Sequence, residues 1–227
     1  MIKLHHLENS RSHRVLWLLE ELGLEYEVVR YRRDRATMLA PPELRAVHPL
    51  GKSPVIEDDG QVVAESAVII EHLTERYDGA HRLSPLAGPA DDPERTRYRY
   101  WMHYAEASAM PPLLLSLVFS RLKSAPMPFF AKPIARGIAD RALSVFVRPQ
   151  IRLHLDYMEA ELRREEWFAG PRFTAADIQM SFPVEAAVAR GGATGHPRLQ
   201  SFVERIRERP AYRRALEKGG PYEIAGG

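Results

Sequence analysis

Residues 48–73 read HPLGKSPVIEDDGQVVAESAVIIEHL, and this stretch decides the fold. Two short apolar runs, 55–56 and 62–64, are joined through Asp58-Asp59-Gly60, in which glycine accepts the positive φ that a tight turn requires. A helical pattern of apolar residues follows over 66–77. The stretch therefore predicts a β-hairpin that leads into a helix.

The preceding residues extend this hairpin into a small sheet domain. Their patterns predict strands at 2–6 and 25–31, a helix over 15–22 that stops at Gly23, and a short helix at 42–47. The first 80 residues thus read β-α-β-α-β-β-α. This order predicts an α/β domain with a mixed sheet, because the first βαβ unit is parallel and the last two strands are antiparallel.

Beyond residue 91 the strand signals end and helical patterns take over. A segment rich in Pro and Gly, 79–94, separates the two parts. Pro149 is expected to kink or break the second long helical stretch. The predicted helices cover 91–121, 137–164, 174–190, 197–208 and 210–218. The predicted domains are an α/β domain at 1–80, a linker at 81–90 and an all-helical domain at 91–227.

A capping box is predicted at Thr174-Ala175-Ala176-Asp177. The Thr174 hydroxyl is expected to accept a hydrogen bond from the backbone amide of Asp177, while the Asp177 carboxylate reaches back. This pattern marks the start of a helix and contributes to folding rather than to catalysis.

The composition excludes several classes of function. The chain has 32 basic and 30 acidic side chains and a net charge of +2, which does not indicate nucleic acid or an anionic membrane as the main partner. Because there is no cysteine, disulfides and thiolate chemistry by the protein itself are excluded. No secretory signal is found, and the longest uncharged run, 107–120, is too short to span a bilayer. We therefore expect a cytoplasmic protein, and no residue spacing predicts a metal site.

Pro54 and the pair Glu65-Ser66 are not needed to make a hairpin. A trans proline is tolerated at the start of a strand, whereas a cis proline would turn the backbone of the preceding residue outward. Ser66 occupies the expected N-cap, where a hydroxyl and free amides favour an anion, and Glu65 offers a carboxylate to an ammonium group. Together they fit an α-amino acid headgroup. The same pair also fits a plain capped helix with a solvated acid.

Residues Asn9-Ser10-Arg11-Ser12 lie between the first strand and the first helix. Ser10 is either an N-cap only or also a donor to an anion at that helix terminus. If the anion is a thiolate, lowering its pKa from about 8.5 to about 6.5 requires roughly 2.7 kcal/mol. A hydrogen bond to a charged group contributes roughly 1.5–3 kcal/mol and a helix terminus roughly 0.3–1 kcal/mol. These two contributions suffice without cysteine or metal.

Four motifs in order, NSRSHRVLWLLEELGLEYE, HPLGKSPVI, AESAVIIEHL and FTAADIQMSFPVE, resemble those of the cytosolic glutathione transferases. The resemblance covers essentially the whole chain and is nearest to serine-type, theta-like bacterial and fungal members. It implies a thioredoxin-like N-terminal domain followed by a helical-bundle C-terminal domain. Glutathione is then a co-substrate, and no metal is implied.

The resemblance also assigns roles to residues. It implies a cis peptide bond before Pro54 and a backbone contact from Ser53 to the cysteinyl part of glutathione. It implies that Glu65 and Ser66 hold the γ-glutamyl headgroup and that Lys52 contacts the glycyl end.

The segment before the first helix departs from several classes of the family. It contains no tyrosine, which argues against the tyrosine-type classes, and the absence of cysteine excludes the thiol-transferase, dehydroascorbate-reductase and glutathionyl-lyase types. With Arg14 as the anchor, Ser10 matches the catalytic serine of the theta-like pattern. Ser12 remains the alternative, as does a helix terminus without a hydroxyl.

The electrophile is expected between the domains. Tyr100, Tyr104 and Ser108 share one helix face and are predicted to line this pocket, although the same spacing also fits core packing. The resemblance implies a homodimer, in which Glu106 is a candidate to reach a neighbouring subunit's γ-glutamyl group. The predicted activity is conjugation of the glutathione thiolate to an apolar electrophile. Glutathione-dependent peroxidase, dehalogenase or isomerase activity remains an alternative, as does a non-catalytic binding protein.

Overall fold

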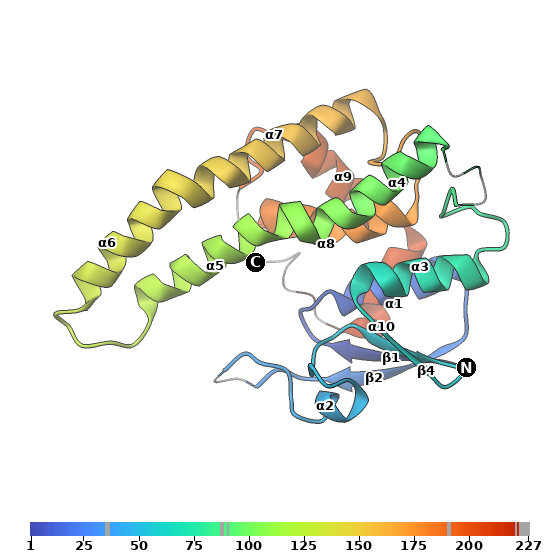
Figure 1. The fold of residues 1–227 in the computed structure, drawn as a ribbon, viewed down its shortest axis with the longest axis horizontal. Helices are drawn as coiled ribbons and strands as arrows, with labels where there is room; N and C mark the ends of the chain where they lie inside the picture. Colours follow the sequence, from blue (N-terminus) through green and yellow to red (C-terminus); the bar gives the residue numbers. More distant parts are fainter. Residues whose placement is uncertain (35–36, 87–88, 90, 190–191, 221, 223–227) are drawn as a thin grey trace.

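The computed structural model describes residues 1–34, 37–86, 89, 91–189, 192–220 and 222. A sheet-containing half is followed along the chain by a helical half (Figure 1). The elements of the first half are β1 (Ile2–Leu7), α1 (Ser12–Leu22), β2 (Tyr26–Tyr31), α2 (Leu44–Val47), β3 (Val55–Asp58), β4 (Gln61–Ala64) and α3 (Ser66–Tyr77). The predicted order β-α-β-α-β-β-α is confirmed.

The sheet is mixed, as predicted, with the strand order β2-β1-β3-β4. β1 runs parallel to β2 and antiparallel to β3, so that Leu4 pairs with Val28 on one side and Ile56 on the other. The β3–β4 turn has positive φ at Asp59 (48°) and Gly60 (84°), as a type I′ turn requires. The Asp-Gly pair therefore fixes the hairpin register.

The helical half contains α4 (Pro93–Tyr104), the π turn η1 (Ala105–Ala109), α5 (Met110–Ser124), α6 (Lys132–Ala142), the π turn η2 (Leu143–Val147), α7 (Arg148–Arg164), α8 (Ala175–Ala189), α9 (Pro197–Glu208) and α10 (Pro210–Gly219). The predicted helical stretches are present. Parts of the predicted domains lie outside the described residues. In the predicted linker these are 87–88 and 90, and in the predicted helical domain they are 190–191, 221 and 223–227. Residue 190 is also the last residue of the predicted helix 174–190. The division of the chain at 81–90 stays a prediction.

Each π turn lies next to proline. Because a proline lacks an N–H group, it leaves a carbonyl of the preceding turn without its helical donor. The wider turn η1 bonds the Met110 amide to the Ala105 carbonyl, just before Pro111 and Pro112. In η2 the Arg148 amide bonds to the Leu143 carbonyl, just before Pro149. The chain thus stays helical through Pro149, where the sequence predicted a kink or break.

Helix α1 connects the two halves. It packs on β1 and also contacts α3, α8 and α10. Trp17 of α1 is fully buried, and its ring meets that of Tyr212 of α10 edge-on at 5.1 Å between centroids. The apolar core is therefore continuous across both halves.

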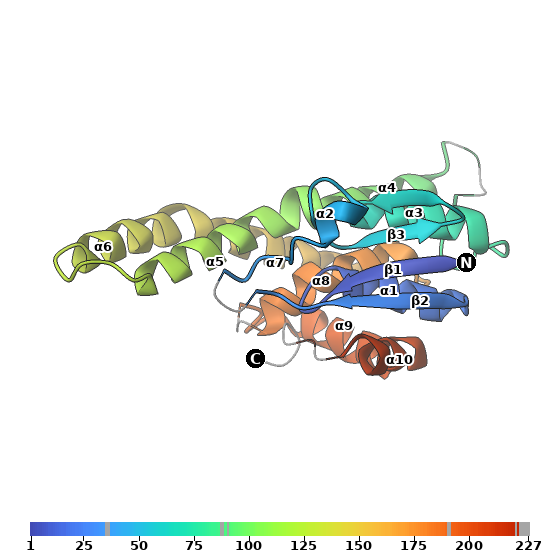
Figure 2. The ribbon, with the colours of Figure 1, turned by 90° about the horizontal axis from the view of Figure 1, so that it is seen from below.

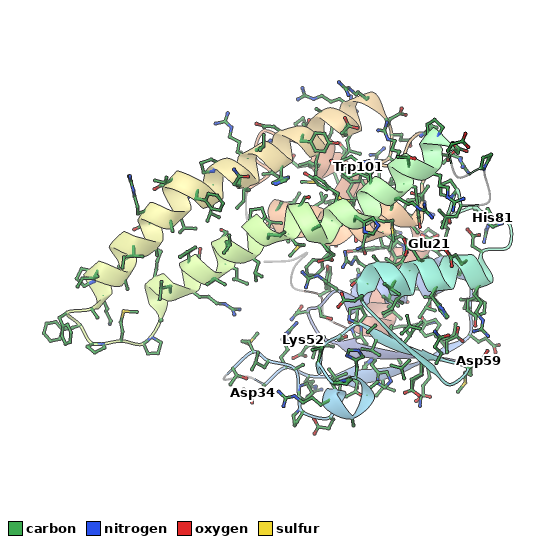
Figure 3. The ribbon with its side chains drawn as sticks, viewed as in Figure 1. Glu21, Asp34, Lys52, Asp59, His81 and Trp101 are labelled. Carbon is green, nitrogen blue, oxygen red and sulfur yellow. The ribbon has the colours of Figure 1, made fainter. Side chains whose placement is uncertain are left out.

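The helices α5, α6 and α7 form an arm that extends beyond the rest of the molecule (Figures 1 and 2). The α5 helix leads out and the α6–η2–α7 helix returns beside it. In Figure 3, Lys52 and Asp59 mark opposite ends of the sheet half, and Trp101 lies in the helical half. Lys52 precedes β3 and thereby marks the end at which the pocket described below opens.

Candidate functional site

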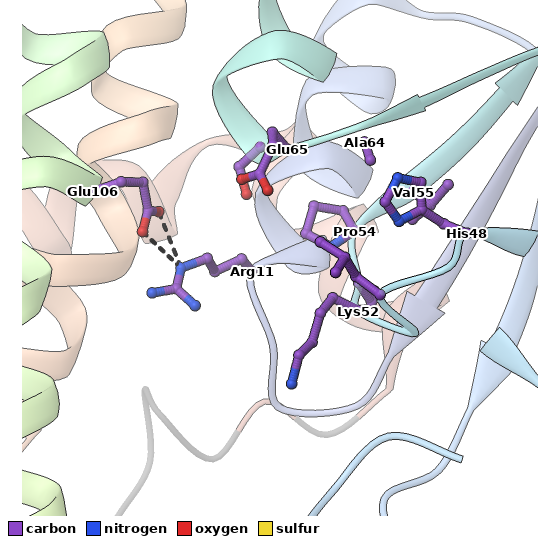
Figure 4. A pocket seen from close by; sticks show the side chains of 11 residues that line it. Arg11, His48, Lys52, Pro54, Val55, Ala64, Glu65 and Glu106 are labelled. Carbon is purple, nitrogen blue, oxygen red and sulfur yellow. Dashed lines mark hydrogen bonds and ion pairs between the residues drawn. The ribbon is translucent and has the colours of Figure 1, made fainter. Parts of the chain in front are cut away.

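A pocket of about 330 Å³ opens where the two halves meet (Figure 4). Its walls come from the start of α1, the loop before β3, the start of α3 and the π turn η1. The lining residues are Arg11, His48, Leu50, Lys52, Ser53, Pro54, Val55, Ala64, Glu65, Ser66 and Glu106. The structure thus brings together the five residues predicted to bind glutathione, namely Lys52, Ser53, Pro54, Glu65 and Ser66.

The Ser53–Pro54 peptide bond is cis, as the resemblance implies. The β1–β3 ladder ends at the pair His5–Val55, because Pro54 has no N–H group to continue it. Beyond this pair, the Ser53 hydroxyl replaces the ladder hydrogen bonds. It donates to the His5 carbonyl at 2.8 Å and accepts from the Leu7 amide at 3.2 Å. Among the described residues, the backbone amide and carbonyl of Ser53 have no backbone partner. Both groups thus remain available to a peptide.

Glu65 and Ser66 begin helix α3, but the predicted cap is shifted by one residue. Glu65 is the N-cap, with φ 71° and ψ 126°, and its carbonyl accepts the first helical bond, from the Ile69 amide at 2.9 Å. Ser66 is already helical, so the assignment of Ser66 as N-cap was wrong. A positive φ at a non-glycine residue is uncommon and costs about 1–3 kcal/mol, a strain that is typical of binding sites.

The two candidate serines are buried behind the pocket, and neither is among its lining residues. The Ser10 and Ser12 hydroxyl oxygens are 2.7 Å apart, and Ser10 donates to the Leu7 carbonyl at 2.7 Å. Ser12 also lies 2.9 Å from Nδ1 of His6. Burial lowers the pKa of His6 to about 4, so the ring is neutral at physiological pH. Arg11, rather than Ser10, is the N-cap of α1.

An ion cluster that the sequence reading missed forms the wall opposite Pro54. Glu106 of η1 accepts from Nε of Arg11 at 3.0 Å and also pairs with Arg14, which is fully buried. Arg14 donates in addition to the Gln179 carbonyl of α8. Although burial opposes ionisation, the guanidinium groups of Arg14 and Arg11 lower the pKa of Glu106. The cluster joins the two halves, and Glu106 meets arginines of its own chain.

The residues predicted for the electrophile pocket lie elsewhere. Tyr104 is buried, and its hydroxyl is 2.6 Å from Nδ1 of His154 on α7. Tyr100 stacks on Tyr104 at 5.5 Å between ring centroids and is 45% exposed. Ser108 is half-buried in η1. None of these three lines the pocket, because the helix turns its tyrosines toward α7; their assignment to the electrophile stays a prediction.

The capping box at the start of α8 is formed. The Asp177 carboxylate accepts from the amides of Thr174 and Phe168, each at 2.8 Å, and from the Thr174 hydroxyl at 3.1 Å. One predicted detail was wrong: the Asp177 amide donates to the Thr174 carbonyl rather than to its hydroxyl. Burial raises the pKa of Asp177 to about 7, against the effect of these donors.

In the described part of the chain, no three or more His, Asp or Glu side chains are placed to hold a metal ion. The helices within the same residues include none whose length and apolarity would let it cross a bilayer.

The first half has a mixed four-stranded sheet with a cis proline at a peptide-sized pocket, and a helical half follows it. These features define a two-domain protein with a thioredoxin-like first domain. Family profiles agree: the glutathione S-transferase N-terminal domain matches residues 10–76, and the C-terminal domain matches residues 126–210.

Curated relatives cover most of this chain. Glutathione S-transferase 3 of Schizosaccharomyces pombe is 41% identical over 96% of this chain and 88% of the relative. Glutathione S-transferase 1 of Saccharomyces cerevisiae is 34% identical over 96% of this chain and 95% of the relative. A solved glutathione S-transferase from Actinobacillus pleuropneumoniae superposes with a TM-score of 0.80 at 33% identity, covering 100% of this chain and 97% of the other. The chain belongs to the glutathione S-transferase family.

Proposed function

We propose that this protein transfers glutathione to an electrophile. The thiol loses its proton to solvent, and a sulfur lone pair forms a bond to an electrophilic carbon. In a substitution, the bond to the leaving group breaks and the leaving group departs with its electron pair. The protein contributes a bound, oriented thiolate.

The observation that carries this proposal is the pocket that unites the cis-proline loop with the start of α3. We assign the cysteinyl backbone to the free amide and carbonyl of Ser53, beside Pro54, because these groups can pair with a peptide as a strand would. The γ-glutamyl ammonium is assigned to the Glu65 carboxylate, and its carboxylate to Ser66 and the first amides of α3. The exposed ammonium of Lys52 is assigned to the glycyl carboxylate.

Ser10 remains our choice for the hydroxyl donor to sulfur, with Ser12 as the alternative. The Ser10 hydroxyl must turn from the Leu7 carbonyl toward the ligand, exchanging a neutral hydrogen bond for one to a charged acceptor. Ser12 is fully buried and held by His6, which makes the same rotation harder.

The reaction consumes the thiol form of glutathione. Cytosol keeps glutathione more reduced than the secretory pathway does, so a cytoplasmic location suits this chemistry.

We further propose a homodimer in which the arm contributes to the interface. Monomers rarely expose a large apolar patch, yet Phe129 and Phe130 at the tip are 84% and 65% exposed. Further exposed apolar side chains follow the arm: Leu114, Val118, Leu122, Ile134, Ile138, Val145, Phe146 and Leu153. Light scattering should give a mass of twice the 25.9 kDa of one chain. The substitution Phe146→Asp should lower the measured mass toward that of the monomer. A wild-type protein that is monomeric at micromolar concentration would refute the proposed homodimer.

Titration calorimetry with glutathione tests the site. We expect Glu65→Gln and Ser66→Ala each to weaken binding about tenfold or more, because each removes a hydrogen bond to a charged group. Glu75→Gln, on the same helix but exposed and outside the pocket, is the matched control and should bind as the wild type does. Absence of glutathione binding by the wild type would refute the proposal.

A panel of electrophiles then separates the activities. Conjugation of 1-chloro-2,4-dinitrobenzene should release one chloride per glutathione consumed, whereas a peroxidase would consume hydroperoxide and release oxidised glutathione. Binding without turnover of any electrophile would favour a non-catalytic role.

A further inference from the structure

The guanidinium group of Arg11 is held at the pocket wall with four of its five N–H donors unused. Its Nε lies 3.0 and 2.9 Å from the two carboxylate oxygens of Glu106, and its Cζ lies 5.1 Å from the ring centre of Phe182. Among the described residues, its two terminal amino groups have no hydrogen-bond partner. Figure 4 shows Arg11 between Glu106 and the Pro54 loop. Glu106 and Phe182 thus fix the side chain, while four N–H donors stay available.

The cluster around Arg11 carries a net positive charge. Glu106 is the one acid that pairs with both Arg11 and Arg14 in the described contacts, so two cations share a single anion. Arg14 is fully buried and has no direct access to a ligand, whereas the Arg11 side chain is 37% exposed and lines the pocket. The other charged residues of the lining, Lys52 and Glu65, balance each other. This cluster therefore holds one cation more than it holds anions, and of its two cations Arg11 is the one that lines the pocket and can meet an anion there.

Other donors at the end of β1 are already occupied. The Ser10 hydroxyl donates to the Leu7 carbonyl, and the Ser12 amide donates to the Ser10 hydroxyl oxygen at 3.2 Å. The next two amides of α1, those of His13 and Arg14, donate to the carbonyls of Ser10 and Arg11. The helix terminus and the serines therefore offer fewer free donors than the sequence indicates, while Arg11 offers a charged one.

We propose that Arg11, positioned by Glu106, is the charged donor that stabilises the glutathione thiolate, acting beside the Ser10 hydroxyl. This inference rests on the proposed function. In this role Arg11 is a catalytic residue, because its terminal amino groups would contact the sulfur. An opposite charge within about 4–6 Å of a thiol lowers its pKa by about 1–3 units, which is the effect that a glutathione transferase requires.

Ultraviolet titration of the bound thiolate tests this directly. In Arg11→Gln, we expect the thiol pKa of bound glutathione to rise by about 1–2 units. With a wild-type thiol pKa of about 6.5, we expect kcat/KM with 1-chloro-2,4-dinitrobenzene to fall about five- to fiftyfold at pH 6.5 and to recover toward the wild-type value as the pH passes the new pKa. Arg11→Lys keeps the positive charge, so it should raise the thiol pKa by less than half of the rise expected in Arg11→Gln. S-methylglutathione has no ionisable thiol, so its affinity should change less than twofold in both variants.

The matched control is Arg209→Gln. Arg209 also pairs with a glutamate of the other half, Glu21, and lies over an aromatic ring, that of Phe173, but it is outside the pocket. Its loss should lower stability without moving the thiol pKa. Urea unfolding of each variant ensures that folded protein is compared.

Three outcomes would overturn the inference. The first is an unchanged thiol pKa in Arg11→Gln, the second an equal rise in Arg11→Lys, and the third an equal loss of glutathione and S-methylglutathione affinity. In all three, wild-type binding would still uphold the proposed function. If the wild type binds neither peptide, the proposed function and this inference both fall.

Discussion

Replacing Glu106 with alanine should strongly destabilise the protein. Arg14, in the interior, is 0% exposed, and its charged group has two hydrogen-bond partners among the described residues, the Gln179 carbonyl and the Glu106 carboxylate. Glu106→Ala leaves this guanidinium buried without a counter-ion. It also frees Arg11, but that side chain reaches water.

The size of the effect follows from the burial of Arg14. Removing one partner of a buried ion pair typically costs about 3–5 kcal/mol. The Glu106 side chain is 33% exposed, so water can enter the vacated space and the lower part of this range is expected. For a chain of this length, 1 kcal/mol shifts Tm by about 2–4 °C, which gives a loss of roughly 6–12 °C for 3 kcal/mol.

Urea and thermal unfolding followed by circular dichroism, at one fixed protein concentration, measure this loss. The double variant Arg14→Met/Glu106→Leu removes both charges and should recover most of the stability, because apolar replacement of a buried pair is often neutral. Arg172→Ala is the control, since it breaks a pair with Glu94 in which the side chains are 54% and 39% exposed, and it should cost less than about 1 kcal/mol. A Glu106→Ala loss no larger than that of the control, or a double variant less stable than Glu106→Ala, would refute the reasoning.

Three further predictions concern the helical half. Asp177→Ala removes the acceptor of three buried donors and should cost about 2–4 kcal/mol in urea unfolding; a loss below 1 kcal/mol would contradict this. Burial raises the pKa of Glu185 from its ordinary 4.5 to about 7, so the folded chain holds this proton more tightly and stability should fall as the pH rises through that window. Glu185→Gln should flatten that part of the pH profile of unfolding, and an unchanged slope would count against the assignment. A Cβ on Gly219 would lie 2.9 Å from Cδ2 of Leu16, so Gly219→Ala should lower stability by about 1–2 kcal/mol, and a thermal scan without change would show that the contact relaxes freely.

The fold was readable from local chemistry. Gly60 required the hairpin turn, Gly23 adopts the left-handed conformation (φ 66°) that ends α1, and the shift from strand to helical periodicity separated the two halves. The five residues assigned to glutathione share one pocket because two segments that are close in sequence, 52–54 and 65–66, flank the antiparallel pair of β3 and β4, where Val55 pairs with Ala64. These features depend on short stretches of sequence, so they can be predicted from one sequence.

The remaining features depend on contacts across long sequence distances. Arg11 and Glu106 are 95 residues apart, and no local pattern links them. In the sequence, a role for Arg11 was indicated only by its position next to Ser10. The interpretation of this segment relied on the serine hydroxyl and not on the arginine charge. The direction of the serine hydroxyls is decided by His6 and the Leu7 carbonyl, and the direction of Tyr104 by His154 on α7.

The π turn at Ala105–Ala109 also acts as a phase shift in the helix. One additional residue in a turn rotates everything beyond it by about 100° relative to a regular helix. A helical wheel carried through this segment therefore assigns later residues to the wrong side. Removing one residue at this turn should therefore rotate α5 relative to α4 by about the same angle.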